Sequence, residues 1–408
     1  MKKYLVILAI AAIGFAACNK TQEAKSFSAN IVLSSSEEGV PMPSEFSVKV
    51  TSQEGATVFD QTVSVTGTSV AVSGLIAGNY SVSVFGTSDF GGRIYNFSGS
   101  AVAVAITQEG QNVEIVLNVS KETALLFKEI YYTGPSGYKE EGAATPYRDD
   151  NFFEIFNNSK TDVYLDGLCI AHVAPDVATE IYSWELDGGR SAADYVYCKV
   201  IWQFPGSGNQ YKLAAGKSVV VASVPIDHTQ KIEGSLDLSS ADFEFFVENQ
   251  NIYSDNPSIP NMVLKFGQLG NGADRYLPTV MGPAMILFNP EGNIDNSTFV
   301  SPVGKEDKCK EIPIAWVVDG VEAVNTANKI EFKRLPNAID GGAVYMTEGI
   351  EYEPIPGYPL VMTRYDHTSV SFSRKFKNGS DISEGFMDTN NSSNDFVANP
   401  APAIRRDL

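Results

Sequence analysis

Residues 151–167 read NFFEIFNNSKTDVYLDG, and this stretch indicates the fold class of the whole chain. Side chains alternate between the two faces of a strand, so FFEIF places Glu154 on one face together with two Phe rings. The Asn-Asn-Ser segment at 157–159 tolerates the left-handed backbone of a turn, and Tyr-Leu at 164–165 returns before Asp-Gly reverses the chain. We therefore expect a β-hairpin that supplies the central strand pair of a sandwich.

Toward the N-terminus, short alternating segments follow one another up to residue 120. They read ANIVLSS, EFSVKVTS, TVFDQTVSV, SVAVSGL, NYSVSVFGTS, IYNFSGSAVAVAI and NVEIVLNVS. Apolar and β-branched residues at every second position, interrupted by Gly, Ser and Asn about every 8 to 12 residues, are typical of an antiparallel sandwich. These segments predict one seven-stranded domain at residues 27–120.

The rest of the chain continues in the same pattern, from ALLFKEIYYTGP at 124–135 to SVSFSRKF at 369–376. Two long stretches, about 168–210 and 225–283, separate the strand-like segments and are interpreted as insertions. We predict an all-β protein of two antiparallel β-sandwich domains, in which residues 121–408 form the second, elaborated domain.

The chain opens with MKKYLVILAIAAIGFAACNK, which combines a positive start, an apolar run and small residues that end at Cys18. The apolar run is too short for a bilayer core of about 30 Å, so the pattern is that of an export signal. Phe-Ala-Ala-Cys at 15–18 resembles the lipobox of bacterial lipoproteins. This resemblance implies removal of residues 1–17, a lipid anchor on Cys18 and a tether at 18–26. From Asn19 it implies attachment to the outer membrane, with surface exposure as a further expectation.

Two internal stretches carry further resemblances. Leu75, Gly78 and Tyr80 in VSGLIAGNYSVSVFG resemble the turn-and-strand pattern of transthyretin-like and carboxypeptidase-regulatory-like sandwiches, which implies a stalk or spacer. FKEI at 127–130, FEIFNN at 153–158 and VYLDG at 163–167, followed by Leu213 and Gly216, resemble the immunoglobulin-like lamin-tail domain. The combination resembles an uncharacterised family of Bacteroidota surface lipoproteins, and this implies a TonB-dependent outer-membrane receptor as a partner.

The charge balance narrows the class of partner. The chain has 30 basic and 49 acidic residues, and removing Lys2 and Lys3 with the signal changes the net charge from -19 to -21, because 28 basic residues then remain. A chain this acidic repels phosphate backbones, so we expect no nucleic-acid partner.

Cysteine and histidine are too few for an obvious metal cluster. An odd set of Cys169, Cys198 and Cys309 without CxxC spacing leaves two readings, buried thiols or one disulfide such as Cys169–Cys198. The three histidines are His172, His228 and His367, and the last two share an Asp-His-Thr tripeptide. A metal or haem ligand is one reading. We expect solvated loop histidines, since adjacent residues on a strand point to opposite faces.

A dense group of aromatic residues within the first insertion is the candidate ligand-binding site. Its members are Tyr182, Trp184, Tyr195, Tyr197, Trp202, Phe204 and Tyr211. Aromatic side chains on the loops of a rigid sandwich commonly recognise sugars, haem or proteins. The alternative is that these rings point inward from additional strands.

A candidate calcium loop lies near the C-terminus. Asp388, Asn390, Ser392 and Asn394 place oxygen atoms at alternate positions, as the first half of a calcium loop does. The alternative is a loop of Asn and Ser side chains that cap their own backbone.

Catalysis has little support in the sequence, which lacks GxSxG, HExxH and phosphate-binding loop motifs. Glu129 and Glu154 form a conceivable carboxylate pair, but their positions match the lamin-tail pattern, which accounts for them by fold alone. We therefore expect a non-catalytic outer-membrane lipoprotein that serves nutrient capture with a TonB-dependent transporter. The alternative is an adhesive or structural envelope protein that binds other proteins.

Overall fold

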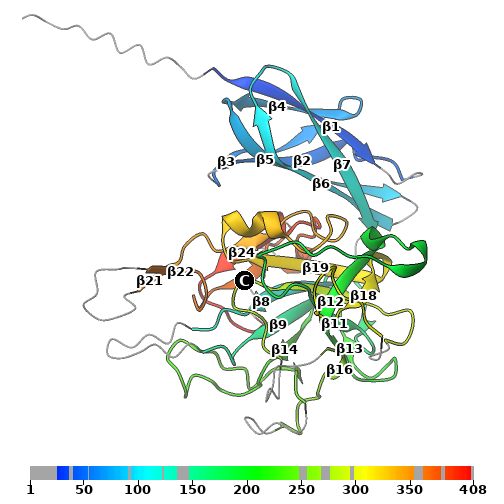
Figure 1. Cartoon of the computed structure of the whole chain (residues 1–408), viewed down its shortest axis with the longest axis vertical. Coiled ribbons are helices and arrows are strands. Elements are labelled where there is room, and N and C mark those ends of the chain that lie inside the picture. The colour runs from blue at the N-terminus through cyan, green and yellow to red at the C-terminus, as the bar shows by residue number, and fades with distance from the viewer. Residues whose placement is uncertain are drawn as a thin grey trace, which may run out of the picture.

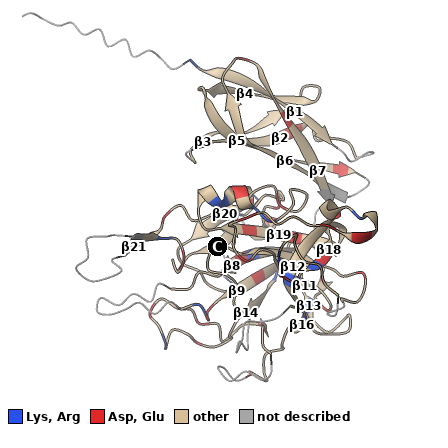
Figure 2. Ribbon diagram, viewed as in Figure 1, with Lys and Arg blue, Asp and Glu red and all other residues tan. Residues whose placement is uncertain are grey.

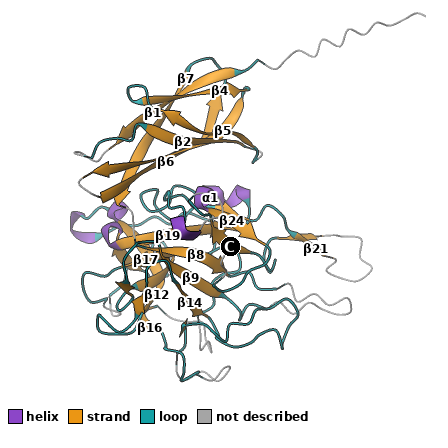
Figure 3. Cartoon of the chain, turned by 180° about the vertical axis from the view of Figure 1, so that it is seen from behind, coloured by secondary structure: helices purple, strands orange, loops and turns teal. Residues whose placement is uncertain are grey.

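The computed structural model describes residues 25–35, 40–53, 55–90, 93–121, 124–135, 147–247, 255–267, 276–294, 298–352, 362–377 and 382–405. The export signal and Cys18 lie outside these residues. Within them, no helix is long and apolar enough to cross a membrane. Figure 1 shows an upper layer built from the first strands and a larger lower part built from the rest, and Figure 3 shows the same arrangement from behind.

The upper part is a seven-stranded assembly in the order β3-β2-β5-β6-β7-β1-β4. Its strands are β1 (Phe27–Ser35), β2 (Glu45–Ser52), β3 (Thr57–Ser64), β4 (Ser69–Leu75), β5 (Gly78–Phe90), β6 (Arg93–Ile106) and β7 (Gln111–Lys121). The end of β7 pairs with β6 and its beginning pairs with β1, so this strand joins two layers. Alternate residues such as Phe46, Val48 and Val50 fill the core between them, and polar residues face outward.

The lower part contains two larger sheets. The six-stranded sheet has the order β15-β14-β9-β8-β23-β24, and the seven-stranded sheet has the order β16-β12-β11-β17-β19-β20, with β18 paired to β12. The first sheet consists of β8 (Leu125–Tyr131), β9 (Phe152–Asn157), β14 (Ser218–Ala222), β15 (Phe243–Glu244), β23 (Ser371–Arg374) and β24 (Phe396–Asn399). The second consists of β11 (Cys169–Val173), β12 (Tyr195–Gln203), β16 (Val263–Phe266), β17 (Ala284–Phe288), β18 (Lys310–Pro313), β19 (Val317–Val324) and β20 (Val344–Tyr345).

Short elements complete the described chain. Two ribbons pair β10 (Val163–Tyr164) with β13 (Lys212–Leu213) and β21 (Ile350–Tyr352) with β22 (Met362–Arg364). The helical turns are η1 (Asp187–Gly189), η2 (Ala192–Asp194), η3 (Ile314–Trp316), η4 (Ala327–Phe332), η5 (Ile382–Glu384) and α1 (Ser392–Asp395). The all-β prediction is confirmed. Most strand pairs are antiparallel, and β1/β7, β14/β15 and β19/β20 pair in parallel.

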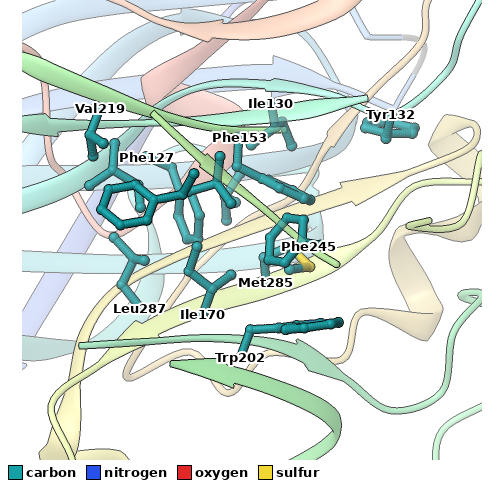
Figure 4. Packing of buried hydrophobic residues seen from close by; sticks show 14 of the residues in the cluster. Phe127, Ile130, Tyr132, Phe153, Ile170, Trp202, Val219, Phe245, Met285 and Leu287 are labelled. Atoms are coloured by element: carbon teal, nitrogen blue, oxygen red, sulfur yellow. The ribbon is translucent and has the colours of Figure 1, made fainter. Parts of the chain in front are cut away.

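The two larger sheets pack face to face around one apolar core. Figure 4 shows Phe127, Phe153 and Val219 of the six-stranded sheet against Ile170, Trp202 and Leu287 of the other. Burying each side chain of this size contributes about 1.5–3 kcal/mol. All residues of β8 and β9 are buried, because the far face of this sheet is covered by smaller apolar clusters around Phe152 and Phe156. Simple alternation of buried and exposed residues is therefore absent from these two strands.

The predicted hairpin at 151–167 is wrong in its pairing. β9 lies in the interior of its sheet, where it pairs with β8 on one side and β14 on the other, and β10 pairs with β13. Two neighbours already use the backbone groups of β9, so the following chain cannot return along it. The Asn157 side chain instead bonds Thr161 O at 2.8 Å and Leu213 O at 3.1 Å, which directs the chain toward β13.

A buried ion-pair network joins the two sheets. Arg374 of β23 donates to both carboxylate oxygens of Asp319 on β19, at 2.9 and 2.8 Å, and to Phe127 O at 2.8 Å. Its third nitrogen donates to Met387 O at 2.9 Å and lies 3.4 Å from Asp388 and from Asp395. Figure 2 shows charged segments on interior strands such as β19 as well as on loops. The guanidinium is therefore fully surrounded by acceptors, as a buried charge must be.

Replacing Arg374 tests how strongly the fold depends on this network. Arg374→Met should lower the free energy of unfolding by about 3–5 kcal/mol, because the carboxylates of Asp319 and Asp395 remain buried without their counter-ion. The double variant Arg374→Met/Asp319→Leu should recover part of that loss. Urea unfolding monitored by tryptophan fluorescence measures both. The surface control is Lys212→Ala, which breaks the exposed pair with Asp162 and should leave the midpoint unchanged. A midpoint for Arg374→Met equal to that of the control would contradict the assigned role.

Candidate functional site

The seven aromatic residues of the predicted ligand site do not form one surface. Trp202 and Phe204 are each only 1% exposed and belong to the main core, where Trp202 packs on Phe245 and Phe204 on Phe243. Tyr211 also packs against Phe243, at the edge of that core. The assignment of Trp202 and Phe204 to a surface ligand site is corrected: strand β12 turns Trp202 inward, as the alternative had it, and Phe204, directly after the strand, is buried in the same core.

The remaining four aromatic residues form a separate small cluster. Trp184 stacks on Tyr197 with ring centroids 3.8 Å apart, and Tyr182 meets Trp184 edge-on. The Tyr182 hydroxyl donates to Asp307, and the guanidinium of Arg190 lies over the Tyr195 ring. These contacts pack a loop onto β12 and β18. The four rings contact one another and do not form an open surface for a ligand.

The side chains of the candidate calcium loop have separate partners in the structure. Asp388 lies beside Arg374, Ser392 donates to Asp340 Oδ2 at 2.6 Å, and Asn394 accepts from Ser83 of β5 at 3.3 Å. Asn391 caps α1 through Ser393 N. The structure therefore directs Asp388, Ser392 and Asn394 toward different partners and does not gather them as one set of calcium ligands. Among the described residues, no three His, Cys, Asp or Glu side chains gather as metal ligands.

The histidines and cysteines are buried. His172 bonds the Tyr276 hydroxyl at 2.8 Å, His228 lies against Tyr147 and Val224, and His367 bonds Tyr147 O at 3.2 Å. Burial lowers the pKa of His172 to about 4, so its ring is neutral. The expectation of solvated loop histidines is wrong, because all three rings are buried and each makes a hydrogen bond to a Tyr side chain or a backbone carbonyl inside the protein. The three thiols, Cys169, Cys198 and Cys309, are free and buried.

Glu129 and Glu154 face each other across β8 and β9 but serve the fold. Glu154 accepts from Lys128 Nζ at 2.8 Å, and Glu129 accepts from Asn399 at 3.2 Å and from Ser371. Burial, with a smaller contribution from the Glu154 charge, raises the pKa of Glu129 to about 7. Both carboxyl groups are almost fully buried, so the pair has no route to a substrate.

A cleft between the upper sandwich and the lower part has room for a ligand. Its volume is about 660 Å³, within the range of small-molecule sites. We call it the interlayer cleft. Its roof is the outward face of β2 and β5, because Phe46 and Val48 face the core and the alternate residues face away. The roof side chains are Ser47, Lys49, Ser83, Phe85 and Thr87, with Asp60 and Asn96 beside them.

The floor comes from two segments that the Arg374 network holds. Lys375 and Lys377 follow β23 directly, and residues 387–389 and Asn394 belong to the loop before α1 and to α1 itself. Lys375 Nζ donates to Asn394 O at 2.6 Å. Burial and, next, the positive charge of Lys49 lower the pKa of Lys375. Lys49 of the roof and Lys375 of the floor, which come from different parts of the chain, therefore both line the cleft.

Hydrogen bonds fix the roof above the floor. Ser83 Oγ donates to Asn394 Oδ1 at 3.3 Å, Ser100 Oγ donates to Gly341 O at 2.9 Å, and Asn118 Nδ2 donates to Asn337 O at 3.0 Å. The sequence analysis missed this site. The period of β2 places Lys49 on the outward face, but nothing local reveals that residues 375–394 face it.

Comparison with known proteins places the chain near an uncharacterised family. Residues 214–403 match the model of a family described as "Protein of unknown function (DUF4876)". A crystal structure of a DUF4876 family protein from Bacteroides thetaiotaomicron VPI-5482 shares 28% identity with a TM-score of 0.59, and the alignment covers 93% of this chain and 97% of that one. No curated protein matches the chain.

Two further solved structures share much less. A putative adhesin from Bacteroides ovatus has 11% identity and a TM-score of 0.17, covering 38% of this chain and 57% of that one. BcpA, the major pilin subunit of Bacillus cereus, has 12% identity and a TM-score of 0.17, covering 73% and 95%. The family model and the structure from Bacteroides thetaiotaomicron support the expected relation to an uncharacterised family of Bacteroidota. The likeness to lamin-tail and regulatory-like sandwiches stays a prediction.

The buried carboxyl of Glu129 predicts a pH dependence of stability. Its pKa is about 7 in the folded chain against 4.5 ordinarily, so the folded state holds the proton more tightly and stability falls as pH rises from about 4.5 to 7. Glu129→Gln should change little at pH 5 and should stabilise the protein at pH 8, by up to about 3 kcal/mol. Urea unfolding at both pH values measures the effect. Glu114→Gln, which removes an exposed carboxylate from β7, is the matched control. Equal effects of Glu129→Gln at pH 5 and pH 8 would contradict the prediction.

Proposed function

We propose that this chain is a non-catalytic binding protein of the bacterial outer membrane, anchored by lipid on Cys18, that captures a small solute in the interlayer cleft for a TonB-dependent receptor. The cleft is the observation that carries this proposal. It combines a volume of about 660 Å³ with polar side chains and one aromatic wall, Phe85. Such a combination is characteristic of small-molecule sites.

The use of the charged residues supports a binding role over a catalytic one. The buried carboxyl groups of Glu154, Asp319 and Glu322 each accept from a Lys or Arg in the fold. The Glu322 partner, Arg334, also donates to four carbonyl groups. These groups hold sheets and loops together, and none of the three carboxylates is among the residues that line the interlayer cleft, nor is any histidine or cysteine.

The construction of the cleft suits capture by a fixed surface. The roof is one face of a complete sandwich and the floor is tied to the Arg374 network, so both walls are rigid before a solute arrives. Preorganised walls reduce the entropic cost of binding. A lipid anchor at the N-terminus would leave the cleft attached to the membrane through the tether at 18–26 and the upper sandwich.

A solute screen on the full chain in detergent tests the binding role. Solutes that enter the cleft should raise the melting temperature, because binding stabilises the folded state by about 2.7 kcal/mol at a hundredfold excess over Kd. Ser47→Trp, which places a large ring in the roof, should abolish every such shift. Ser81→Trp, on the same face of β5 but outside the lining, should retain them. Shifts that survive in Ser47→Trp would place solute binding elsewhere and contradict the proposal.

Affinity purification from gently solubilised outer membranes tests the partner. A tagged full chain should recover a TonB-dependent receptor in stoichiometric amount, identified by mass spectrometry. Recovery with envelope or host proteins only would instead favour the adhesive or structural alternative. Cys18→Ala is the control for anchoring, since the variant should leave the membrane fraction.

A further inference from the structure

We infer that the solute of the interlayer cleft is a small organic anion whose carboxylate or phosphate group lies between Lys49 of the roof and Lys375 of the floor. This inference rests on the proposed solute-binding function and narrows it to a chemical class. It depends on the charges in the lining, the geometry of the two lysines and the polarity of the surrounding walls.

The lining concentrates positive charge in a strongly acidic protein. Lys49, Lys375 and Lys377 line the cleft, while the whole chain has a net charge of -19. Lys49 and Lys375 are both half-buried, and they approach from parts of the chain more than 300 residues apart. Two ammonium groups that line one cleft repel each other, and an anion between them removes that repulsion.

The lining holds three lysines against two acidic residues, Asp60 and Asp388. Asp388 lies 3.4 Å from the Arg374 guanidinium, so its negative charge is already balanced within the floor. Asp60 is opposite Lys49 on the neighbouring strand β3 and is exposed at the rim of the roof. The Lys375 ammonium has three donor hydrogens, and its bond to Asn394 O uses one while holding the group in place.

The other walls suit a body that carries hydroxyl groups and an apolar face. Ser47, Thr87 and Thr389 supply hydroxyl groups, Asn96 supplies an amide, and Phe85 supplies a flat apolar surface. Aromatic rings commonly stack on the apolar face of a sugar-like ring while neighbouring polar groups bond its hydroxyls. A sugar acid therefore has the required features, and its neutral parent sugar lacks only the charge.

Isothermal titration of the full chain in detergent with glucuronate, glucose and inorganic phosphate tests the inference. Glucuronate should bind at least tenfold more tightly than glucose. Lys49→Gln and Lys375→Gln should each weaken glucuronate binding about tenfold or more, with melting temperatures that show intact folding. Lys160→Gln, an equal charge change on the turn after β9 and outside the lining, should leave binding unchanged. Competition by phosphate would assign the anion site to phosphate-bearing solutes, and its failure would assign it to carboxylates.

The outcomes separate this inference from the function on which it rests. Glucose binding that equals glucuronate binding and is lost in Ser47→Trp would overturn the anion assignment and leave solute binding intact. Equal effects of Lys49→Gln and Lys160→Gln would overturn it as well. A lack of binding by glucuronate, glucose and phosphate at millimolar concentration would also overturn the anion assignment. The solute screen with Ser47→Trp judges the proposed function independently of these results.

Discussion

The buried guanidinium of Arg374 ties together four segments of this molecule. A charge that is 1% exposed is tolerated only when every donor finds an acceptor, and those acceptors come from four different segments. Phe127 belongs to β8, Asp319 to β19, Met387 to the loop before α1, and Asp395 to the end of α1. The two large sheets and the C-terminal loop must therefore reach their native positions together, which makes the network a condition for the sandwich as well as a contact within it.

The same constraint positions the candidate site. Lys375 directly follows Arg374, and Met387 and Asp388 of the floor bond or approach the same guanidinium. The floor of the interlayer cleft is thus an extension of the core network into solvent, and its side chains cannot move independently of the sheets beneath. The roof is attached differently, through individual hydrogen bonds such as Ser100 to Gly341. The floor, held by the ion-pair network, and the roof, held above it by hydrogen bonds, meet at the cleft.

The sequence was informative about local conformation and much less so about pairing. The strands of the upper sandwich follow from period-two alternation, since one face of β2 is apolar and the other polar. For β8 and β9 that signal fails, because both faces are covered, and charged residues such as Glu154 lie inside. Arg374 and Asp319 are 55 residues apart, so no local sequence pattern predicts their contact. The many aromatic residues around Trp202 reflect packing in the core. No local sequence pattern indicates that Lys49 and Lys375 line the same cleft.

The distribution of charge explains why the cleft differs from the rest of the surface. The acidic excess is spread over exposed strands and loops, whereas the buried carboxylates of Asp319 and Glu154 are matched by Arg374 and Lys128. An anion approaching this protein is repelled by the surface at long range, over roughly a Debye length of about 8–10 Å. Within the cleft, the proposed anion would lie between Lys49 and Lys375, which attract it. Added neutral salt should therefore raise the association rate of the anion, because it screens the repulsion by the acidic surface. It should also raise the dissociation rate, because it screens the attraction by the two lysines. At a uniformly basic site, added salt would instead lower the association rate.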